Sequence, residues 1–240
     1  MSILDTITPA GPWTFDQAVT DAFDDMLSRS IPAHDTMRDL TTALAVRYAR
    51  AQPAGRVVDL GCSRGRALAP IAQALGHQRS YVAVDTSAPM RAAAAETLAE
   101  YVDAGACEVR ATDLRHDFPD DAPAAVILSV LTLQFTPIEY RHAILTRAHD
   151  ALMPGGALLL VEKVLGDDHH LDQALTETYH AMKGAHGYSA DAIARKAASL
   201  EGVLVPVTDA WNRELLRAAG FTHVDTYWRA LNFAGYLAVR

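Results

Sequence analysis

The sequence lacks the features that mark disulfide-rich, secreted or membrane-spanning proteins. Its 240 residues include only two cysteines, Cys62 and Cys107, which fall at the ends of different predicted strands and are expected to be free thiols. No apolar run approaches the length that spans a bilayer, and the opening stretch MSILDTITPAGPW has neither a basic region nor a long apolar one. We therefore expect a cytoplasmic protein that has no membrane partner.

Positive charge is also scarce. Lysine and arginine number 21 against 29 aspartates and glutamates, and the formal net charge is -8, which opposes the basic face that phosphate binding requires. We expect no direct nucleic-acid partner. The pair His169–His170 has no Cys, His or acid motif converging on it, so the sequence predicts no metal site either.

The chain has no internal repeat, low-complexity tract or long linker, so residues 1–240 are expected to form one domain. Within it, residues 1–54 are predicted to form an N-terminal helical cap and residues 164–208 a helical insertion on the substrate side. Apolar runs that alternate with helical patterns predict an α/β fold with a doubly wound, mostly parallel, seven-stranded sheet. The predicted strands are 56–60, 81–85, 107–113, 124–130, 157–163 and the closing pair THVDTYW and FAGYLAV. Helices are predicted over 89–104 and 137–152, and a turn over 153–156.

Two helices are predicted before the first strand. The word TFDQ (Thr14–Gln17) has the spacing of a capping box and predicts the start of the first helix. The pair Ile31-Pro32 interrupts that helix. The second helix is expected to bury one face, which consists of Met37, Leu40, Leu44 and Tyr48.

A glycine-rich turn follows the first strand with the spacing Asp59-x-Gly61-x-x-x-Gly65. Such a turn lets a ligand approach bare backbone, and the helix after it offers N–H groups to an anionic group. The G-x-G-x-x-G pattern of dinucleotide enzymes, whose additional glycine admits a pyrophosphate, is absent. The turn therefore disfavours NAD as the ligand.

Acidic residues end the next two predicted strands. Asp85 lies where a carboxylate accepts both hydroxyls of a ribose, and Asp113 where one accepts from an exocyclic amine such as that of adenine. With Asp59 they form a line at adjacent strand ends, in the crevice where open α/β sheets bind ligands. The alternative role for Asp85 and Asp113 is helix capping, since DTSAPM also has the pattern of a cap. The whole set favours S-adenosylmethionine over a dinucleotide.

Several short words of the sequence are shared with a known family. They are WTFDQAV (13–19), DDMLSRSIP (24–32), DLGCS (59–63), TLQF (132–135), PGGALLLVEK (154–163), GYS (187–189), LEGV (200–203) and AGF (219–221). On these words the chain resembles class I S-adenosylmethionine-dependent methyltransferases, with a Rossmann-like sheet, and more closely the carboxy-S-adenosylmethionine synthase family. The resemblance implies a homodimer, an antiparallel last strand and S-adenosyl-L-methionine as the cofactor. It further implies that Gly61, Cys62 and Ser63 line the methionine end of the cofactor, Asp85 and Thr86 the ribose, and Asp113 and Leu114 the adenine.

The chain departs from this family at informative positions. The resemblance implies a tyrosine, an asparagine and an arginine at the cofactor, and this chain has His34, Val130 and Ala197 in their places. Alanine cannot replace the charge-assisted pair between an arginine and a carboxylate, and on helical geometry Arg195 and Lys196 point to other faces. The sequence therefore favours methyl transfer from S-adenosylmethionine onto a small-molecule acceptor. Two alternatives stay open: carboxyl transfer from prephenate to S-adenosylmethionine, and a non-catalytic cofactor-binding protein.

Three residues are candidates for a catalytic role. His34 replaces a residue that the resemblance places at the reacting methyl, so it is predicted to orient or deprotonate the acceptor. The alternative is a hydrogen-bonded loop histidine. His180 and Tyr188, with His186, lie between two predicted helices, where they form either an acceptor pocket or an ordinary capped surface.

Three charged residues near the predicted site have two open roles each. Arg64 and Arg66 either bring positive charge to an anionic group or are solvated residues of the first helical turn, where positive charge opposes the helix dipole. Glu162 either faces the crevice or pairs with Lys163 on a solvated turn.

Overall fold

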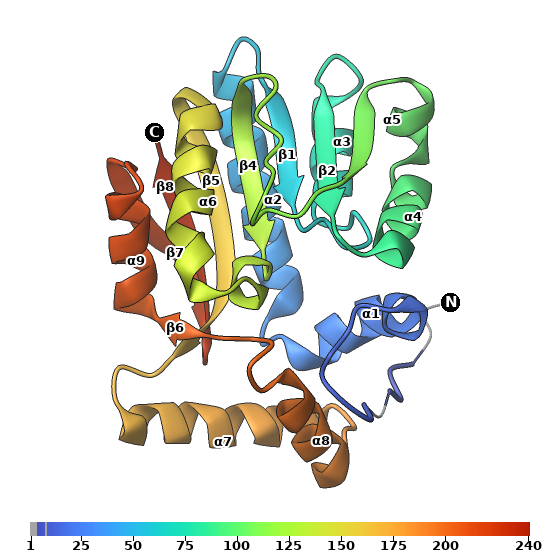
Figure 1. The fold of residues 1–240 in the computed structure, drawn as a ribbon, viewed down its shortest axis with the longest axis vertical. Helices are drawn as coiled ribbons and strands as arrows, with labels where there is room; N and C mark the ends of the chain where they lie inside the picture. Colours follow the sequence, from blue (N-terminus) through green and yellow to red (C-terminus); the bar gives the residue numbers. More distant parts are fainter. Residues whose placement is uncertain (1–3, 8) are drawn as a thin grey trace.

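The computed structural model describes residues 4–7 and 9–240, and a mixed sheet lies at its centre (Figure 1). Along its main path the strand order is β3-β2-β1-β4-β5-β8-β7. Strands β1 to β5 pair in parallel, and β8 runs antiparallel between β5 and β7. This arrangement confirms the predicted doubly wound, mostly parallel α/β fold. The strands are β1 (Arg56–Leu60), β2 (Tyr81–Asp85), β3 (Cys107–Ala111), β4 (Ala124–Val130), β5 (Leu152–Leu165), β6 (Val207–Thr208), β7 (His223–Ala230) and β8 (Phe233–Val239).

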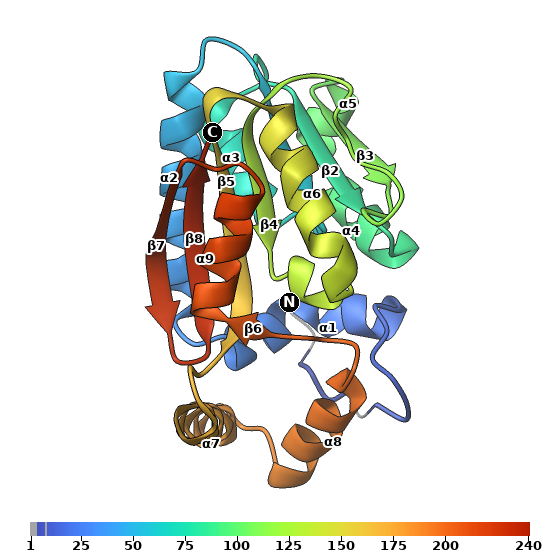
Figure 2. The ribbon, with the colours of Figure 1, turned by 60° about the vertical axis from the view of Figure 1, so that its left-hand side comes forward.

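Helices cover both faces of the sheet because its central strands are apolar on both sides. All residues of β1 are buried. Helices α6 and α9 pack on one face, and α2, α3, α4 and α5 pack on the other (Figure 2). The helices are α1 (Gln17–Ser30), α2 (His34–Ala51), α3 (Leu68–Leu75), α4 (Ala88–Thr97), α5 (Ala99–Asp103), α6 (Ile138–Ala151), α7 (His169–Ala185), α8 (Ala190–Leu200) and α9 (Asp209–Ala218), with a 3₁₀ turn at Leu133–Phe135.

Three helices lie beyond the carboxyl ends of the parallel strands. Helices α1, α7 and α8 are grouped below the tips of β1 and β4 in Figure 1. The backbone N–H of Trp13 donates to the carbonyl of Ser199 at 2.8 Å, which joins the segment before α1 to α8. Since parallel α/β sheets bind ligands at this end, these helices cover the place where the ligand is expected.

The two N-terminal helices differ in detail from the prediction. Helix α1 is capped by Asp16, whose Oδ1 accepts from the N–H of Val19 at 2.9 Å, so the predicted capping box at Thr14 is wrong. Leu40 of α2 is 39% exposed, although it was expected on the buried face. The buried stripe of α2 consists of Met37, Thr41, Ala45 and Ala49. Its small residues let α2 lie close to the sheet, which a search for large apolar residues does not detect.

Other boundaries also differ from the prediction. The helix expected over 89–104 is divided, because Leu98 leaves helical geometry between α4 and α5 while its side chain stays in the core. Strand β3 ends at Ala111 rather than Asp113, the expected turn 153–156 lies within β5, and the short β6 pairs with the far end of β5. Both cysteines are free, as predicted, and both are buried. Among the described residues, no helix combines the length and the hydropathy that crossing a membrane would require.

Candidate active site

A cavity of about 410 Å³ lies at the carboxyl ends of the parallel strands, within the size range of small-molecule sites. Its walls come from the sheet, the segment before α1, and helices α1, α2, α7 and α8. The predicted site residues that line it are His34, Asp59, Gly61, Cys62, Ser63, Asp85, Thr86, Asp113, Leu114 and Val130. Gly65, His180 and Tyr188 were also predicted at the site and do not line the cavity.

The turn after β1 brings bare backbone to the cavity. Gly61 has a φ of +73°, and a Cβ atom there would lie 2.3 Å from the side chain of Thr132. Only glycine fits this position. Ser63 also has a positive φ, of 47°, and its N–H donates to Oδ2 of Asp85 at 2.9 Å. Gly65 has a φ of +73° and shapes the same turn from outside the cavity.

Asp85 ties together the loops that follow β1 and β2. Besides the N–H of Ser63 it accepts the N–H of Ser87, at 2.8 Å on Oδ1. Burial raises the pKa of Asp85, and these backbone donors oppose the rise. The cap of α4 is Ser87, whose Oγ accepts from the N–H of Met90 at 3.3 Å. The helix-capping alternative for Asp85 is therefore wrong, and its carboxylate faces the cavity between the two loops.

Asp113 lies at the outer edge of the cavity, two residues beyond β3. Its Oδ2 is 2.5 Å from Nη2 of Arg115, and this hydrogen-bonded ion pair lowers the pKa of Asp113 to about 2. The chain continues from here through an irregular loop to β4, so Asp113 caps no helix either. It is a charged acceptor beside Leu114.

Asp59 is the most deeply placed acid of the line. It is 1% exposed, its Oδ2 has no hydrogen-bond partner, and desolvation raises its pKa to about 7. Because β1, β2 and β3 are adjacent, Asp59, Asp85 and Asp113 follow one another along the cavity. In the part of the chain that the structure describes, no three His, Cys, Asp or Glu side chains are grouped as a metal site.

His34 is the first residue of α2 and lines the cavity. Its Nδ1 is 3.2 Å from Oδ1 of Asp35, and its Nε2 is buried without a partner. Desolvation lowers the pKa of His34, which favours the neutral ring at neutral pH. A neutral imidazole with an unpartnered nitrogen is suited to accept a proton or a hydrogen bond.

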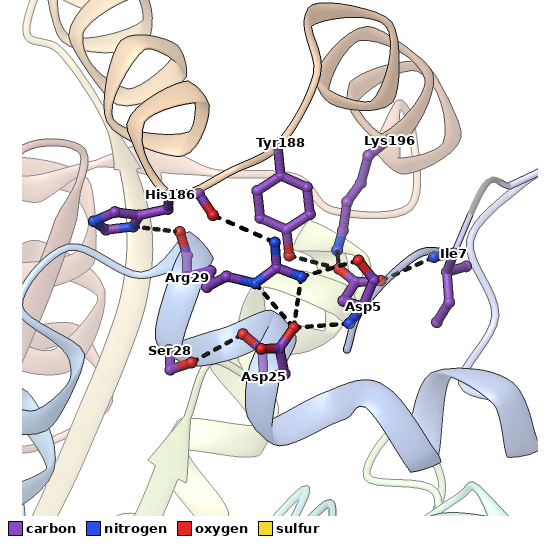
Figure 3. A network of polar contacts seen from close by, with 8 residues as sticks. All are labelled: Asp5, Ile7, Asp25, Ser28, Arg29, His186, Tyr188 and Lys196. Carbon is purple, nitrogen blue, oxygen red and sulfur yellow. Dashed lines mark hydrogen bonds and ion pairs between the residues drawn. The ribbon is translucent and has the colours of Figure 1, made fainter. Parts of the chain in front are cut away.

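Tyr188 belongs to a network behind the cavity (Figure 3). Its hydroxyl donates to Oδ2 of Asp5 at 2.6 Å, and the N–H of Asp5 donates to Oδ2 of Asp25 at 2.7 Å. Arg29 joins both acids, since Nε donates to Asp25 and Nη2 to the carbonyl of Asp5, each at 2.9 Å. This geometry gives Tyr188 a structural role, and the predicted catalytic role of Tyr188 and His180 finds no support in it.

Three lysines that were not predicted as site residues line the cavity: Lys163 of β5, Lys183 of α7 and Lys196 of α8. Nζ of Lys163 and Nζ of Lys183 lie 5.2 and 5.6 Å from the ring centre of Tyr179. Lys196 pairs with Asp5 at 3.3 Å. Lys183 is 5% exposed and lies in no ion pair with a described residue, and desolvation lowers its pKa to about 8.

Lys196 lies at the cavity, where Ala197 was expected. Ala197 is exposed and lies outside the cavity lining, whereas Lys196 is buried and lines it. Lys196 and Ala197 point to different faces, as helical geometry predicts, but Lys196 is the one that faces the cavity. The position at which the family arginine is missing does not belong to the wall of this cavity.

Arg64 and Arg66 form hydrogen bonds that link the turn after β1 to helix α1. Nη1 of Arg64 donates to the carbonyl of Thr20 at 3.0 Å, and Nε of Arg66 donates to Oδ2 of Asp24 at 3.1 Å. Neither predicted role is complete, because both residues line the cavity while one nitrogen of each donates to α1.

Glu162 takes neither of its two expected positions. It is 3% exposed, lies outside the cavity lining, and accepts the N–H of Leu133 at 2.9 Å. Desolvation raises its pKa to about 8, and the charge of Arg141 opposes the rise. Glu162 thus holds the 3₁₀ turn that follows β4.

Comparison with known proteins identifies the type of domain. Residues 57–156 match the family model described as Methyltransferase domain. The chain is 37% identical over 227 residues to the carboxy-S-adenosyl-L-methionine synthase of Methylococcus capsulatus, which covers 94% of this chain and 93% of that protein. It is 38% identical over 229 residues to the enzyme of the same name from Chromohalobacter salexigens, which covers 95% and 83%.

Solved structures show the same fold. An O-methyltransferase family protein from Burkholderia thailandensis superposes with a TM-score of 0.66 at 23% identity. Human N-acetylserotonin methyltransferase in complex with SAM superposes with a TM-score of 0.61 at 17% identity. The matches cover 94% and 93% of this chain but 60% and 55% of those longer chains. The chain therefore has the fold of an S-adenosylmethionine-dependent transferase.

S-adenosyl-L-methionine is the cofactor, as predicted, and the residues of the cavity fit it. The space that a Cβ at Gly61 would fill keeps backbone accessible to the ligand. Asp85 and Asp113 are carboxylate acceptors suited to hydroxyl and amine donors, and the unpartnered Asp59 suits a cationic group. When bound, the cofactor supplies a methyl carbon activated by the sulfonium.

Proposed function

The chain belongs to the carboxy-S-adenosyl-L-methionine synthase family, and from this premise we propose that it transfers a carboxyl group to the methyl carbon of S-adenosylmethionine. The observation that carries the proposal is the convergence of Lys163, Lys183 and Lys196 on one cavity, where, among the described residues, a carboxylate pairs only with Lys196. Uncompensated ammonium groups are costly to bury, so this cavity favours an anionic substrate. A carboxyl donor is necessarily such a substrate, whereas a methyl acceptor is not.

This proposal favours carboxyl transfer, whereas the sequence alone favoured methyl transfer. Methyl transfer was favoured because the arginine implied by the resemblance is replaced by Ala197. Ala197 is exposed and outside the cavity lining, whereas three lysines line the cavity. The lysines supply positive charge there instead, and a lysine ammonium is a good, if less directional, partner for a carboxylate.

We propose prephenate, the donor that the family resemblance implies, as the source of the carboxyl group. Prephenate carries two carboxylates, which Lys163 and Lys183 are placed to bind from two elements of the cavity wall. In the balanced reaction the bond from the prephenate ring to its carboxyl group and the bond to its ring hydroxyl both break, which leaves phenylpyruvate. The methyl carbon loses a proton and gains the carboxyl group, and that proton combines with the departing hydroxide to form water. His34 is the residue proposed to receive or relay that proton, because its ring is neutral and Nε2 is unpartnered.

Mass spectrometry of the ligand retained after native purification tests the proposal. Carboxy-S-adenosylmethionine is the expected ligand. Recovery of S-adenosylhomocysteine, the product of methyl transfer, would count against it, and His34→Ala is expected to lower turnover without releasing the bound cofactor. If His34→Ala leaves turnover unchanged, the role of His34 is wrong while carboxyl transfer still stands.

Methyl transfer to an anionic small molecule is the second candidate. One observation favours it: Val130, which replaces the asparagine implied by the family resemblance, lines the cavity with an apolar side chain. Loss of that amide removes a hydrogen-bonding group from the place where a carboxylated cofactor is expected. Incubation with S-adenosylmethionine and prephenate separates the two candidates, because only carboxyl transfer consumes prephenate.

We also propose a homodimer in the cytoplasm. The homodimer follows the family resemblance, and the two free, buried cysteines suit a reducing compartment. Light scattering after size exclusion is expected to give twice the chain mass, and a monomer mass at micromolar concentration would contradict the dimer.

A further inference from the structure

Arg38 is a half-buried cation without an anion in direct contact among the described residues. It lies on α2, one helical turn after His34, and its side chain lines the cavity. No ion pair within 4.0 Å joins its guanidinium to an acid of the described residues, and desolvation lowers its pKa. The nearby Asp24 is held by Arg66, at 3.1 Å. A guanidinium with five donors is therefore left facing the cavity.

Asp59 is the matching anion. Its carboxylate is 1% exposed, lines the cavity, and has an oxygen without a hydrogen-bond partner. The charges of Arg38 and Asp59 act on each other, but the two side chains are too far apart for an ion pair. Each of the two side chains is therefore left without an ionic partner among the described residues, although unlike charges in such a setting are normally paired.

The order of the strands indicates which part of the cofactor reaches this gap. The sequence of acids across the sheet is Asp113 after β3, Asp85 at the end of β2 and Asp59 in β1. If the adenine and the ribose occupy the first two, the amino-acid end of S-adenosylmethionine lies beside β1. That end carries an ammonium group and a carboxylate on one carbon.

We infer that Arg38 and Asp59 bind the α-carboxylate and the α-ammonium group of S-adenosylmethionine, respectively. Each side chain then gains the partner that the protein does not provide, and the guanidinium can hold the carboxylate through two hydrogen bonds. The inference rests on the cofactor and not on carboxyl transfer. It gives a cofactor-binding function to Arg38, for which the sequence showed no motif.

Calorimetric binding of three ligands to four proteins tests this assignment. The ligands are S-adenosylmethionine, decarboxylated S-adenosylmethionine, which lacks the α-carboxylate, and methylthioadenosine, which lacks the amino-acid end. The proteins are the wild type, Arg38→Ala, Asp59→Asn and the matched control Arg47→Ala, an exposed arginine of the same helix. Methylthioadenosine binding also reports whether each variant keeps its folded nucleoside site.

Arg38→Ala is expected to weaken S-adenosylmethionine roughly 10- to 100-fold, the range for a hydrogen bond to a charged group, and to change decarboxylated S-adenosylmethionine less than about threefold. Asp59→Asn is expected to weaken both amine-bearing ligands and to spare methylthioadenosine. Equal losses for all ligands, or no loss with Arg38→Ala, would overturn the inference. A wild type that fails to bind S-adenosylmethionine would overturn it together with the proposed function. If the expected pattern appears without carboxyl transfer, only the proposed function fails.

Discussion

Oδ2 of Asp5 lies 3.3 Å from Nζ of Lys196, across 191 positions of the chain. The same oxygen accepts the hydroxyl of Tyr188 at 2.6 Å (Figure 3). The carboxylate of Asp5, in the segment before α1, therefore joins that segment to α8. It also neutralises Lys196, one of the three lysines that line the cavity. The other two lysines remain for a substrate.

Asp5→Asn is expected to destabilise the fold by about 3 kcal/mol, because it leaves a buried ammonium group without its carboxylate. The amide oxygen still accepts the hydroxyl of Tyr188, so the loss of stability is due to the missing negative charge. Thermal melts measure it, with the exposed Asp39→Asn as the control. Added prephenate is expected to raise the melting temperature of Asp5→Asn more than that of the wild type. If prephenate raises the melting temperatures of the two proteins equally, Lys196 is not shared between Asp5 and the substrate.

Binding of prephenate is expected to weaken as the pH rises through about 8, since burial lowers the pKa of Lys183 to about 8. Below that pH the ammonium group is charged and attracts a carboxylate, and above it the amine is neutral. Isothermal titration between pH 6.5 and 9 measures the affinity. Lys183→Met should bind about tenfold more weakly at pH 7 and lose most of this pH dependence. A variant with the wild-type profile would remove Lys183 from the substrate site.

The sequence was sufficient to predict the sheet and the acids at its edge, because both depend on local patterns. Apolar runs mark the buried strands β1, β2 and β4, and strand adjacency then brings Asp59, Asp85 and Asp113 to one line. The N-terminal cap was misassigned to Thr14 because Asp16, two residues later, offers an equally short acceptor to the first turn. Such choices depend on the loop geometry, which residue spacing does not determine.

The basic part of the cavity was not predictable from local patterns. Lys163, Lys183 and Lys196 come from three different elements, and each resembles an ordinary surface lysine in its own segment. Arg38 lies outside the apolar face predicted for its helix, and it lines the cavity only in the folded arrangement. Their grouping is a consequence of the tertiary fold, and only the three-dimensional arrangement reveals that they face one space.

Glu162→Gln is expected to make folding stability less dependent on pH. Burial raises the folded-state pKa of Glu162 to about 8 from an ordinary value of 4.5. Between these values the folded protein holds a proton that the unfolded chain has lost, so the unfolding free energy of the wild type falls as the pH rises. Glutamine still accepts the N–H of Leu133 and does not titrate. Urea unfolding at pH 5 and pH 8 should show the advantage of the variant growing with pH, and no change in Glu214→Gln, which is exposed.

Gly61→Ala is expected to cost more stability than Gly105→Ala. Both glycines have a similar positive φ, at which alanine is strained by roughly 1–2 kcal/mol. A Cβ at Gly105 meets nothing within 4 Å, whereas at Gly61 it lies 2.3 Å from Thr132, which adds roughly 1–3 kcal/mol of overpacking. Gly61→Ala should also lose cofactor affinity. Equal melting temperatures for the two variants would show that Thr132 does not restrict the turn.

Turnover with S-adenosylmethionine labelled with ¹³C at the methyl group, in the presence of prephenate, distinguishes carboxyl transfer from methyl transfer. Mass spectrometry of the products follows the labelled carbon. Carboxyl transfer keeps the label on the cofactor, now as carboxy-S-adenosylmethionine, while phenylpyruvate forms in equal amount. Transfer of the label to another molecule, with S-adenosylhomocysteine as the remaining product, would contradict it.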